Sequence, residues 1–222
     1  MDDGYMVVVP VFNGAAFVGA AIRSILGQTI PPHRIIVIDD GSTDRTAAEA
    51  RRCGEGVEVI SQSNAGPGAA CTRGMDLVDA PFMAFLDADD IWLADKAAAQ
   101  LARLRADTGL DGLFTHCFVS RSVQPPFPGL PTQPCWGRSA FVVRTERARA
   151  VGPMIDQPGR RGEMIDWIAR ARTMGLRFEM MAEALMVRRV HENSLTFRRG
   201  ANDAGYLAVA KAALDRRRSS SQ

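Results

Sequence analysis

The sequence predicts an α/β fold, a single Rossmann-like domain with a doubly wound, mostly parallel sheet, and three observations favour it. Apolar runs of four to seven residues alternate with helical segments, the order that covers both faces of a parallel sheet. The connections are short, and two of the runs end directly in aspartates, at Asp39 and Asp87. A chain of 222 residues that is 46% hydrophobic can bury the core of such a sheet.

The first half of the chain carries the regular part of this pattern. Tyr5–Val11 is a continuous apolar, β-branched run, which is typical of a strand covered on both faces. Three further strands are expected at 35–38, 57–60 and 82–86. Helices are expected at 17–26, 47–52 and 69–77, where apolar residues recur at helical spacing or follow a capping sequence.

The second half is less regular. Residues 113–119 alternate as in a strand, and 140–143 form another apolar run. A helix is expected at 163–174, ended by Gly175, and 178–190 could supply two more strands. The segment 124–134 holds five prolines and is expected to be an irregular loop.

The charge balance bears on possible partners. The chain has 27 Lys and Arg against 25 Asp and Glu, a net charge of +2. Nucleic-acid binding depends on many phosphate-neutralising cations, so the balance argues against a nucleic-acid partner. The one dense basic cluster, Arg216–Arg218, precedes three serines and is expected to be a solvated terminus.

The cysteines and the apolar runs bear on the compartment. Cys53, Cys71, Cys117 and Cys135 form no CxxC pair, so buried thiols are expected rather than a zinc cluster or a redox motif. No apolar stretch approaches the roughly 18 residues that span a bilayer, and the first four residues do not resemble a signal peptide. A cytoplasmic location is therefore expected, with no transmembrane segment and with a peripheral contact at the inner membrane face left open.

Acidic residues follow two strands of the expected sheet. Ligands of open α/β sheets bind outside the carboxyl ends of the strands, where Asp39–Asp40 and Asp87–Asp90 should lie. Either cluster alone could equally be a set of turn formers and helix caps. Together they would repel one another unless a divalent cation neutralised them. Carboxylates suit Mg²⁺ or Mn²⁺, and such an ion implies a nucleoside-diphosphate ligand.

At this point the sequence resembles a known family. Five segments, in order, resemble the signatures of the inverting glycosyltransferases of family 2, which have the GT-A fold. These segments are Val9–Asn13, Ser24–Thr29, Ile38–Asp44, Asn64–Gly74 and Phe85–Asp90. The resemblance is strong over about residues 5–95 and looser to about Thr196. It implies a nucleotide-sugar half at 5–95, an acceptor half at 96–200, and a C-terminal helix with a basic and serine-rich tail at 201–222.

The resemblance implies a reaction and roles for several residues. The sugar of a nucleotide donor, with UDP-sugars expected, would pass with inversion to the hydroxyl of an unknown acceptor, as in cell-surface glycan or polysaccharide synthesis. The cofactor would be Mn²⁺ or Mg²⁺. Asp40 would accept a hydrogen bond from the base, Asp87 would lie near the ribose and the metal, and Asp89 would be the principal metal ligand. The segment flanking the nucleobase would comprise Pro10, Val11 and Asn13.

The general base departs from the family pattern. Family members usually supply the Asp of a Glu-Asp pair that opens a helix, whereas this chain has Met164 at that position. Glu163 and Asp166 are three residues apart on one helix, and either could serve as the base or merely cap the helix. Trp167 is expected to belong to the core rather than to an acceptor platform.

A histidine near the end of the resemblance is a further candidate. The segment Val187–Thr196 resembles the family's late Arg-x-His segment, which implies that His191 contacts the metal or the diphosphate. His33 and His116 have no such setting and are expected to be structural.

Two other functions compete with the transferase. Met164 is compatible with a non-catalytic module that binds nucleotide-sugars or glycans on the same fold. The turn Asp39–Thr43 also suggests a magnesium-dependent phosphatase, which is weaker because the first strand carries no aspartate nucleophile. If the chain is a transferase, the proline-rich segment 124–134 is expected to be a variable acceptor lid.

Overall fold

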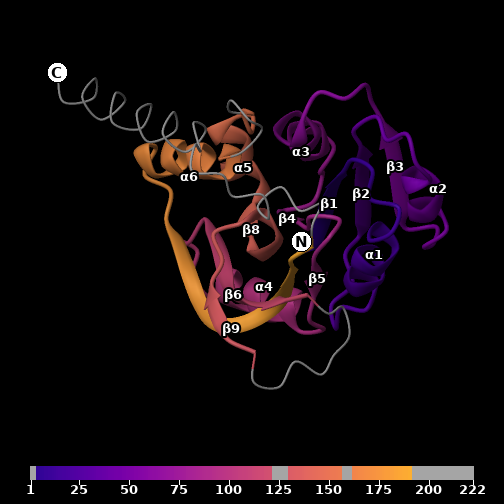
Figure 1. Cartoon of the computed structure of the whole chain (residues 1–222). Helices are drawn as coiled ribbons and strands as arrows, with labels where there is room; N and C mark the ends of the chain where they lie inside the picture. The colour runs from indigo at the N-terminus through magenta and orange to yellow at the C-terminus, as the bar shows by residue number, and fades with distance from the viewer. Residues whose placement is uncertain (1–3, 122–129, 157–161, 192–222) are drawn as a thin grey trace, which may run out of the picture.

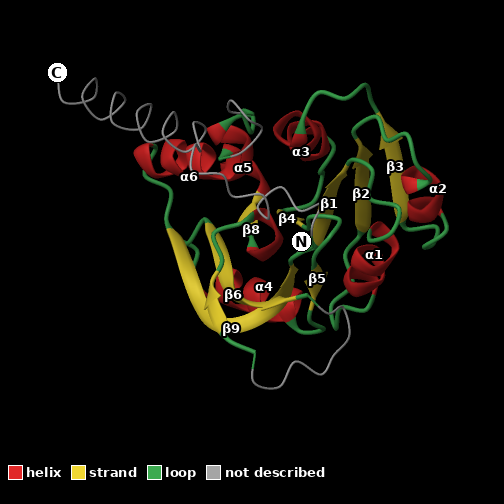
Figure 2. Cartoon of the chain, in the orientation of Figure 1, coloured by secondary structure: helices red, strands yellow, loops and turns green. Residues whose placement is uncertain are grey.

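Nine strands form one mixed sheet in the computed structural model of the chain, which describes residues 4–121, 130–156 and 162–191. The first elements are β1 (Tyr5–Val11), α1 (Val18–Leu26), β2 (Arg34–Asp39), α2 (Thr46–Arg51), β3 (Val57–Ser61), α3 (Pro67–Asp76), β4 (Phe82–Phe85) and β5 (Ile91–Trp92). The later elements are α4 (Lys96–Ala106), β6 (Gly112–Ser120), β7 (Thr132–Pro134), the 3₁₀ helix η1 (Arg138–Ala140), β8 (Val142–Arg144), α5 (Thr145–Val151), α6 (Glu163–Thr173) and β9 (Phe178–Arg189). Figures 1 and 2 show this arrangement.

The sheet has two parts that differ in strand direction. Its order is β3-β2-β1-β4-β8-β6-β9-β5, with β7 paired to β6. The pairs from β3 to β4 are all parallel, whereas β8 pairs antiparallel with both β4 and β6. β6 and β9 are parallel, and the short β5 and β7 pair antiparallel. The α/β prediction is confirmed, and the uninterrupted parallel run comprises the four strands of the first half.

Strand β1 is the centre of the first half. All seven of its residues are buried, as its continuous apolar sequence predicts. A proline within a central strand removes a ladder donor. Pro10 is tolerated because β4 pairs with β1 only as far as Val8, so Pro10 lies beyond the part that is paired on both sides. The carboxyl end of β1 is thus open toward a ligand.

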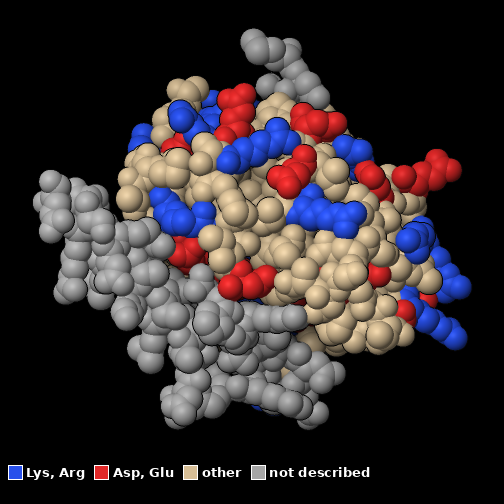
Figure 3. All heavy atoms as spheres, turned by 90° about the horizontal axis from the view of Figure 1, so that it is seen from above, with Lys and Arg blue, Asp and Glu red and all other residues tan. Residues whose placement is uncertain are grey.

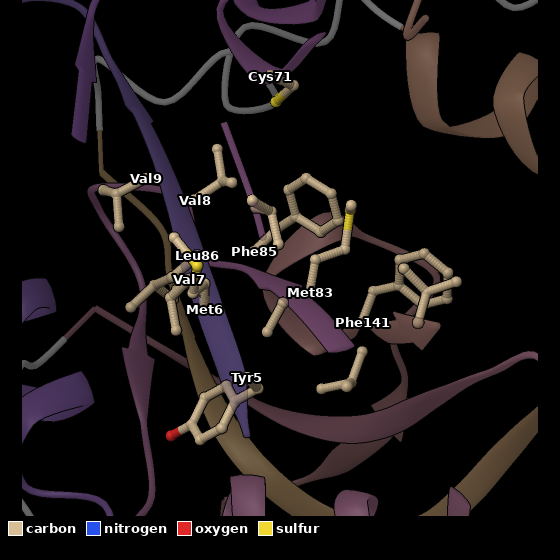
Figure 4. Close-up of a cluster of buried hydrophobic side chains, with 14 of the residues drawn as sticks. Tyr5, Met6, Val7, Val8, Val9, Cys71, Met83, Phe85, Leu86 and Phe141 are labelled. Carbon is tan, nitrogen blue, oxygen red and sulfur yellow. The ribbon is translucent and has the colours of Figure 1, made fainter. Parts of the chain in front are cut away.

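The core continues from β1 into the helices. Helix α3 packs directly on β1 at Gly74, where an added Cβ would lie 2.3 Å from a methyl group of Val8. Figure 4 shows the side chains of β1 beside Met83 and Phe85 of β4 and near Phe141. The contact at Gly74 and the pairing of the strands fix the positions of the loops that follow β1 and β4.

The second half differs from the sequence prediction in three places. Residues 178–189 form the single strand β9, not two strands. A bulge separates its two stretches of pairing, because consecutive residues of β6 at Thr115 and His116 pair with Met181 and Ala184. Helix α4 was not predicted because its buried stripe includes Lys96 and Gln100, and the short helix α5 was also missed.

Some predicted features lie at or beyond the limits of the described residues. The first part of the proline-rich segment and the tail at 201–222 lie outside them, and residues 132–134 form β7 instead of an irregular loop. Among the described helices, none is long and apolar enough to cross a membrane. Figure 3 shows basic and acidic side chains interspersed over the visible face, in agreement with a net charge near zero.

Candidate functional site

A cavity of about 600 Å³ lies at the carboxyl ends of β1, β2 and β4. Its wall includes eight of the nine site residues predicted from the sequence. These are Pro10, Val11, Asn13, Asp40, Asp87, Asp89, Glu163 and His191. Asp166 does not line the cavity, and neither do His33 and His116. The far wall comes from segments 133–139 and 162–165, so the two halves of the chain enclose the cavity between them.

Asn13 joins the end of β1 to the turn after β2. Its backbone N–H donates to Ser42 Oγ at 2.9 Å, and its side-chain oxygen accepts from Thr43 N at 2.8 Å. Its φ angle of 49° is in the left-handed region, which asparagine tolerates better than most residues. Asn13 therefore fixes the shape of the turn at the mouth of the cavity.

Asp40 organises the loop that follows β3. Its carboxylate accepts hydrogen bonds from Gln62 Nε2 at 2.8 Å, Ala65 N at 2.8 Å and Gly66 N at 2.9 Å. The residue is 3% exposed, and a carboxylate has about four acceptor positions. Asp40 thus has room for about one further hydrogen bond, and its contacts within the chain hold the loop in place.

The loop after β3 is also fixed from the second half of the chain. Asp156 accepts hydrogen bonds from the backbone N–H groups of Gly68, at 2.9 and 3.1 Å, and Ala69, at 3.2 Å, at the start of α3. This close approach requires glycine, because an added Cβ at Gly66 would lie 2.4 Å from the Asp156 carboxylate. Gly66 also has a φ of 104°. The carboxylate satisfies donors that a helix start leaves unpaired, and its charge suits the positive end of the helix.

A buried arginine connects the two walls. Arg138, in η1, donates to Asp87 Oδ1 from Nε at 3.0 Å and from Nη2 at 2.7 Å. Its Nη1 donates to Glu163 Oε1 at 2.7 Å. The arginine is 8% exposed, so these charge-assisted hydrogen bonds are shielded from water. The arrangement places a carboxylate of the second half of the chain, Glu163, at a set position relative to the Asp87–Asp89 turn.

Asp89 and His191 form the cation-binding candidate. Nε2 of His191 lies 3.1 Å from Asp89 Oδ2, and the imidazole stacks on Phe17 with ring centroids 4.3 Å apart. Arg189 Nε donates to the Asp89 carbonyl, and its guanidinium carbon lies 5.1 Å from the Phe17 ring. The end of β9 is thereby held against the acidic turn.

The aspartates of the acidic turn at Asp87–Asp90 are buried and close enough together to raise the pKa of two of them. Burial, followed by the charge of Asp87, raises the pKa of Asp89, although the contact with His191 opposes this. Burial, followed by the charges of Asp89 and Asp87, raises the pKa of Asp90 well above its ordinary value. Asp90 accepts a 2.6 Å hydrogen bond from Ser139 and one from Arg189 N at 3.0 Å. Positive charge brought to this turn would favour the ionised carboxylates.

Helix α6 places its acidic residues differently. Glu163 and Met164 both line the cavity, whereas Asp166 is 2% exposed and accepts from Arg170 Nε at 2.9 Å. Arg170 also donates to the carbonyl of Val151, which joins α6 to the end of α5. Trp167 is fully buried, which confirms the prediction that it belongs to the core.

The donor atoms fit a divalent cation only in part. No group of three or more His, Cys, Asp or Glu side chains that could hold an ion occurs within residues 4–121, 130–156 and 162–191. Asp89 offers a carboxylate oxygen, which suits Mg²⁺ or Mn²⁺, and His191 adds an imidazole nitrogen, which is typical of transition-metal sites. A cation held by two protein groups keeps positions for phosphate oxygens, as Mg²⁺ typically does in proteins. The pair therefore fits an ion that is shared with a ligand.

Several residues that shape the site were not predicted. Arg138 bonds to partners 51 and 25 positions away, and no local pattern reveals such distant pairs. The sequence showed Phe17 only as an apolar residue of the helix expected at 17–26, and its ring contact joins it to His191, 174 positions along the chain. The signal that could have identified Arg138 is its position just before the apolar run 140–143, within the part of the chain where the family resemblance is looser.

Comparison with known proteins identifies the family. The family model described as "Glycosyl transferase family 2" matches residues 6–133, more than half of the chain. The succinoglycan biosynthesis protein ExoW of Rhizobium meliloti is 36% identical over 130 residues, covering 51% of this chain and 41% of ExoW. The glycosyltransferase YibD of Escherichia coli is 34% identical over 87 residues, covering 38% of this chain and 25% of YibD. The chain therefore matches less than half the length of either relative.

Solved structures agree with the fold. TarS of S. aureus in complex with UDP-GlcNAc aligns over 95% of this chain and 65% of its own, with a TM-score of 0.73 and 16% identity. The mannosyltransferase PcManGT from Pyrobaculum calidifontis, in complex with GDP-Man and Mn²⁺, aligns over 94% of this chain and 68% of its own, with a TM-score of 0.67 and 16% identity. With the matched signatures and the mixed sheet, these comparisons show that the chain belongs to glycosyl transferase family 2 and has the GT-A fold.

Proposed function

We propose that the chain transfers a sugar from a nucleoside-diphosphate donor to a hydroxyl acceptor, with inversion at the anomeric carbon. The first candidate for the donor is a UDP-sugar. The observation that carries the proposal is the Asp89–His191 pair at the mouth of a cavity whose opposite wall presents Glu163. A leaving diphosphate and an attacking hydroxyl need such opposed groups. The TarS structure in complex with UDP-GlcNAc and the PcManGT structure in complex with GDP-Man and Mn²⁺ support the proposal.

The donor would lie against the first wall. Pro10, Val11 and Asn13 would flank the base, and the remaining acceptor position of Asp40 would receive its N–H. Asp87 has one carboxylate oxygen taken up by Arg138, which leaves the other for the ribose or the cation. Asp89 and His191 would hold Mn²⁺ or Mg²⁺, which stabilises negative charge on the leaving diphosphate when bound.

Glu163 is the residue that we assign as general base. It lines the cavity, and Arg138 holds one of its oxygens at 2.7 Å, so the carboxylate has a set position. Asp166, the other candidate, is buried in its ion pair with Arg170 and reaches no cavity wall. We assign Asp166 to holding α6 on α5, so the proton of the acceptor hydroxyl would pass to Glu163.

A second function has one observation in its favour. Met164 lines the cavity at the position where the family usually has the aspartate base. A module that binds nucleotide-sugars without transferring them would tolerate this residue. Metal-dependent UDP binding, combined with no transfer and no donor hydrolysis across a broad acceptor panel, would favour the binding module over the transferase.

Thermal unfolding with and without ligands tests the proposal. UDP, GDP and their sugar conjugates are added to the purified chain with or without Mn²⁺, and UDP with Mn²⁺ should raise the melting temperature most. A ligand at 100 times its Kd stabilises the folded state by about 2.7 kcal/mol. Asp89→Ala should lose the Mn²⁺-dependent increment and the transfer activity while remaining folded. Asp79→Ala, an exposed surface residue, is the matched control. Undiminished turnover by Asp89→Ala would refute the assignment.

A further inference from the structure

Trp136 differs from the other two tryptophans of the chain. It is 40% exposed and lines the cavity, whereas Trp92 and Trp167 are 3% and 0% exposed. Trp92 donates its indole N–H to the carbonyl of Ser139, and Trp167 donates to that of Gly152. Among the described residues, Trp136 has no such acceptor for its indole N–H. A large aromatic ring with an unused donor therefore faces the cavity.

The ring of Trp136 has a fixed support. It packs on Phe114 of β6 with ring centroids 4.9 Å apart. Phe114 in turn stacks on Phe141 and contacts Phe178, both within the aromatic core of the acceptor half. A side chain that rests on a packed core loses little further conformational entropy when it binds a ligand. The exposed indole is thus a preorganised surface.

Trp136 belongs to the wall opposite the proposed donor site. It stands two residues before Arg138, which bonds to Glu163, the assigned base. Arg172, in the last turn of α6, places its guanidinium carbon 5.2 Å from the Trp136 ring centroid. An acceptor whose hydroxyl approaches Glu163 would extend toward this Trp136–Arg172 pair.

We propose that Trp136 is the platform of the acceptor subsite and that the acceptor is a pyranoside, whose ring lies on the indole. The inference rests on the proposed function and adds the chemical class of the acceptor. A pyranose presents axial C–H groups on its face and hydroxyl groups around its rim. The C–H face suits the negative face of an indole, and the hydroxyl rim suits the Trp136 N–H and the donors of Arg172. An open-chain polyol has no such face.

Tryptophan fluorescence tests the inference, because Trp136 is the one solvent-accessible tryptophan of the three. Methyl pyranosides of glucose, galactose, mannose and N-acetylglucosamine, together with cellobiose and lactose, are added to the chain saturated with UDP and Mg²⁺. At least one pyranoside should change the emission in a saturable way, and glycerol and ribitol should not. The Trp136→Leu variant should lose this response, Trp136→Phe should keep weaker pyranoside binding by calorimetry, and the exposed-site control Leu77→Ala should leave the response unchanged.

The activity readout separates this inference from the proposed function. Trp136→Leu should raise the KM for the responding sugar at least tenfold while the UDP-dependent rise in melting temperature stays the same. Failure of UDP to stabilise the unmodified chain would contradict the proposed function itself. UDP binding together with no response to any pyranoside, or an equal response to ribitol, would overturn the acceptor assignment alone. An unchanged acceptor KM in Trp136→Leu would also overturn it.

Discussion

Residues 5–95 and the described part of residues 96–200 are built on different principles, and we name them the donor half and the acceptor half after the proposed function. In residues 5–85 four parallel strands follow one another with a helix between each pair. Strands β1, β2 and β3 are neighbours both in sequence and in the sheet, and β4 pairs with β1 on its other side. Beyond β4 the sheet continues with β8, β6 and β9, which come from distant parts of the chain. The family signatures are concentrated in the first half, and the family model ends at residue 133. The acidic turns that line the cavity thus belong to the part of the fold with local connections.

The difference extends to how the site is held together. The acceptor half contributes the side chains that tie the two walls: Arg138 to Asp87, Asp156 to the start of α3, and His191 to Asp89. Each of these contacts joins two residues that are more than 50 positions apart in the sequence. The comparison teaches that the regular half supplies the acidic turns of the cavity, while side chains of the irregular half hold these turns in position.

The largest expected effect concerns Glu163 and Asp166, two acids of one helix with different surroundings. Glu163→Gln should lower kcat by about 10²- to 10⁴-fold, the range that a general base supplies, with little change in UDP binding. Asp166→Asn is the matched control and should lower stability by about 1–3 kcal/mol through the weakened pair with Arg170. Steady-state kinetics and urea unfolding measure the two effects. A folded Asp166→Asn variant with the greater loss of kcat would reverse the assignment.

A smaller effect is expected from removing the buried ion pairs that Arg138 forms with Asp87 and Glu163. Arg138→Met leaves Asp87 and Glu163 without their cation and should lower the free energy of unfolding by roughly 3 kcal/mol, because breaking a buried ion pair leaves charge uncompensated. Arg103→Met removes an exposed ion pair with Glu179 and should change the free energy of unfolding by less than about 1 kcal/mol. Urea unfolding compares them. An equal loss of stability in both variants would show that the buried ion pairs of Arg138 stabilise the fold no more than an exposed pair does.

The cap on α3 should contribute less again. Asp156→Ala removes the acceptor for Gly68 N and Ala69 N and should lower the free energy of unfolding by about 1 kcal/mol, the usual effect of losing a cap. Asp156→Asn keeps one acceptor oxygen and should lose less. Both variants should also weaken UDP binding, since the loop at 64–68 borders the cavity. A UDP affinity equal to that of the unmodified chain would mean that the loop keeps its position without this contact.

The cysteines allow the two halves to be compared by thiol reactivity, and no change in the fold is expected from the measurement. In the donor half, burial raises the pKa of Cys71 to about 12. In the acceptor half, the hydrogen bond from Cys117 lowers the pKa of Cys135 to about 7, although burial opposes it. The thiolate is the reactive form, so alkylation of Cys135 by iodoacetamide should speed up as the pH rises through about 7 and level off above it.

Peptide mass spectrometry after timed alkylation measures this pH dependence. Cys117→Ala removes the hydrogen-bond donor, so the midpoint for Cys135 should move upward, toward the ordinary value of a thiol. Cys71 should stay unmodified in the folded chain because it is fully buried. A midpoint that does not move in Cys117→Ala would assign the shift to another neighbour.

Much of the donor half could be predicted from the sequence. Tyr5–Val11 and 35–38 are strands because their apolar runs are too short for core helices and end in turn formers. The acidic turns at Asp40 and Asp89 could be placed at one edge because the carboxyl ends of parallel strands meet there. These conclusions need only local patterns and the rules of parallel sheets.

The tertiary structure decided the rest, because it depends on contacts between distant residues. Helix spacing placed Glu163 and Asp166 on one helix, but only packing against α5 shows that Asp166 is buried with Arg170 and that Glu163 faces the cavity. Likewise, no local motif marks Arg138 or Trp136 in the sequence. Only the fold brings Arg138 to Asp87 and Trp136 to the wall of the cavity. The sequence by itself indicated the family and the acidic and histidine residues of the site, because these lie in local motifs. The fold determined which of these side chains line the cavity, because that depends on contacts between distant segments.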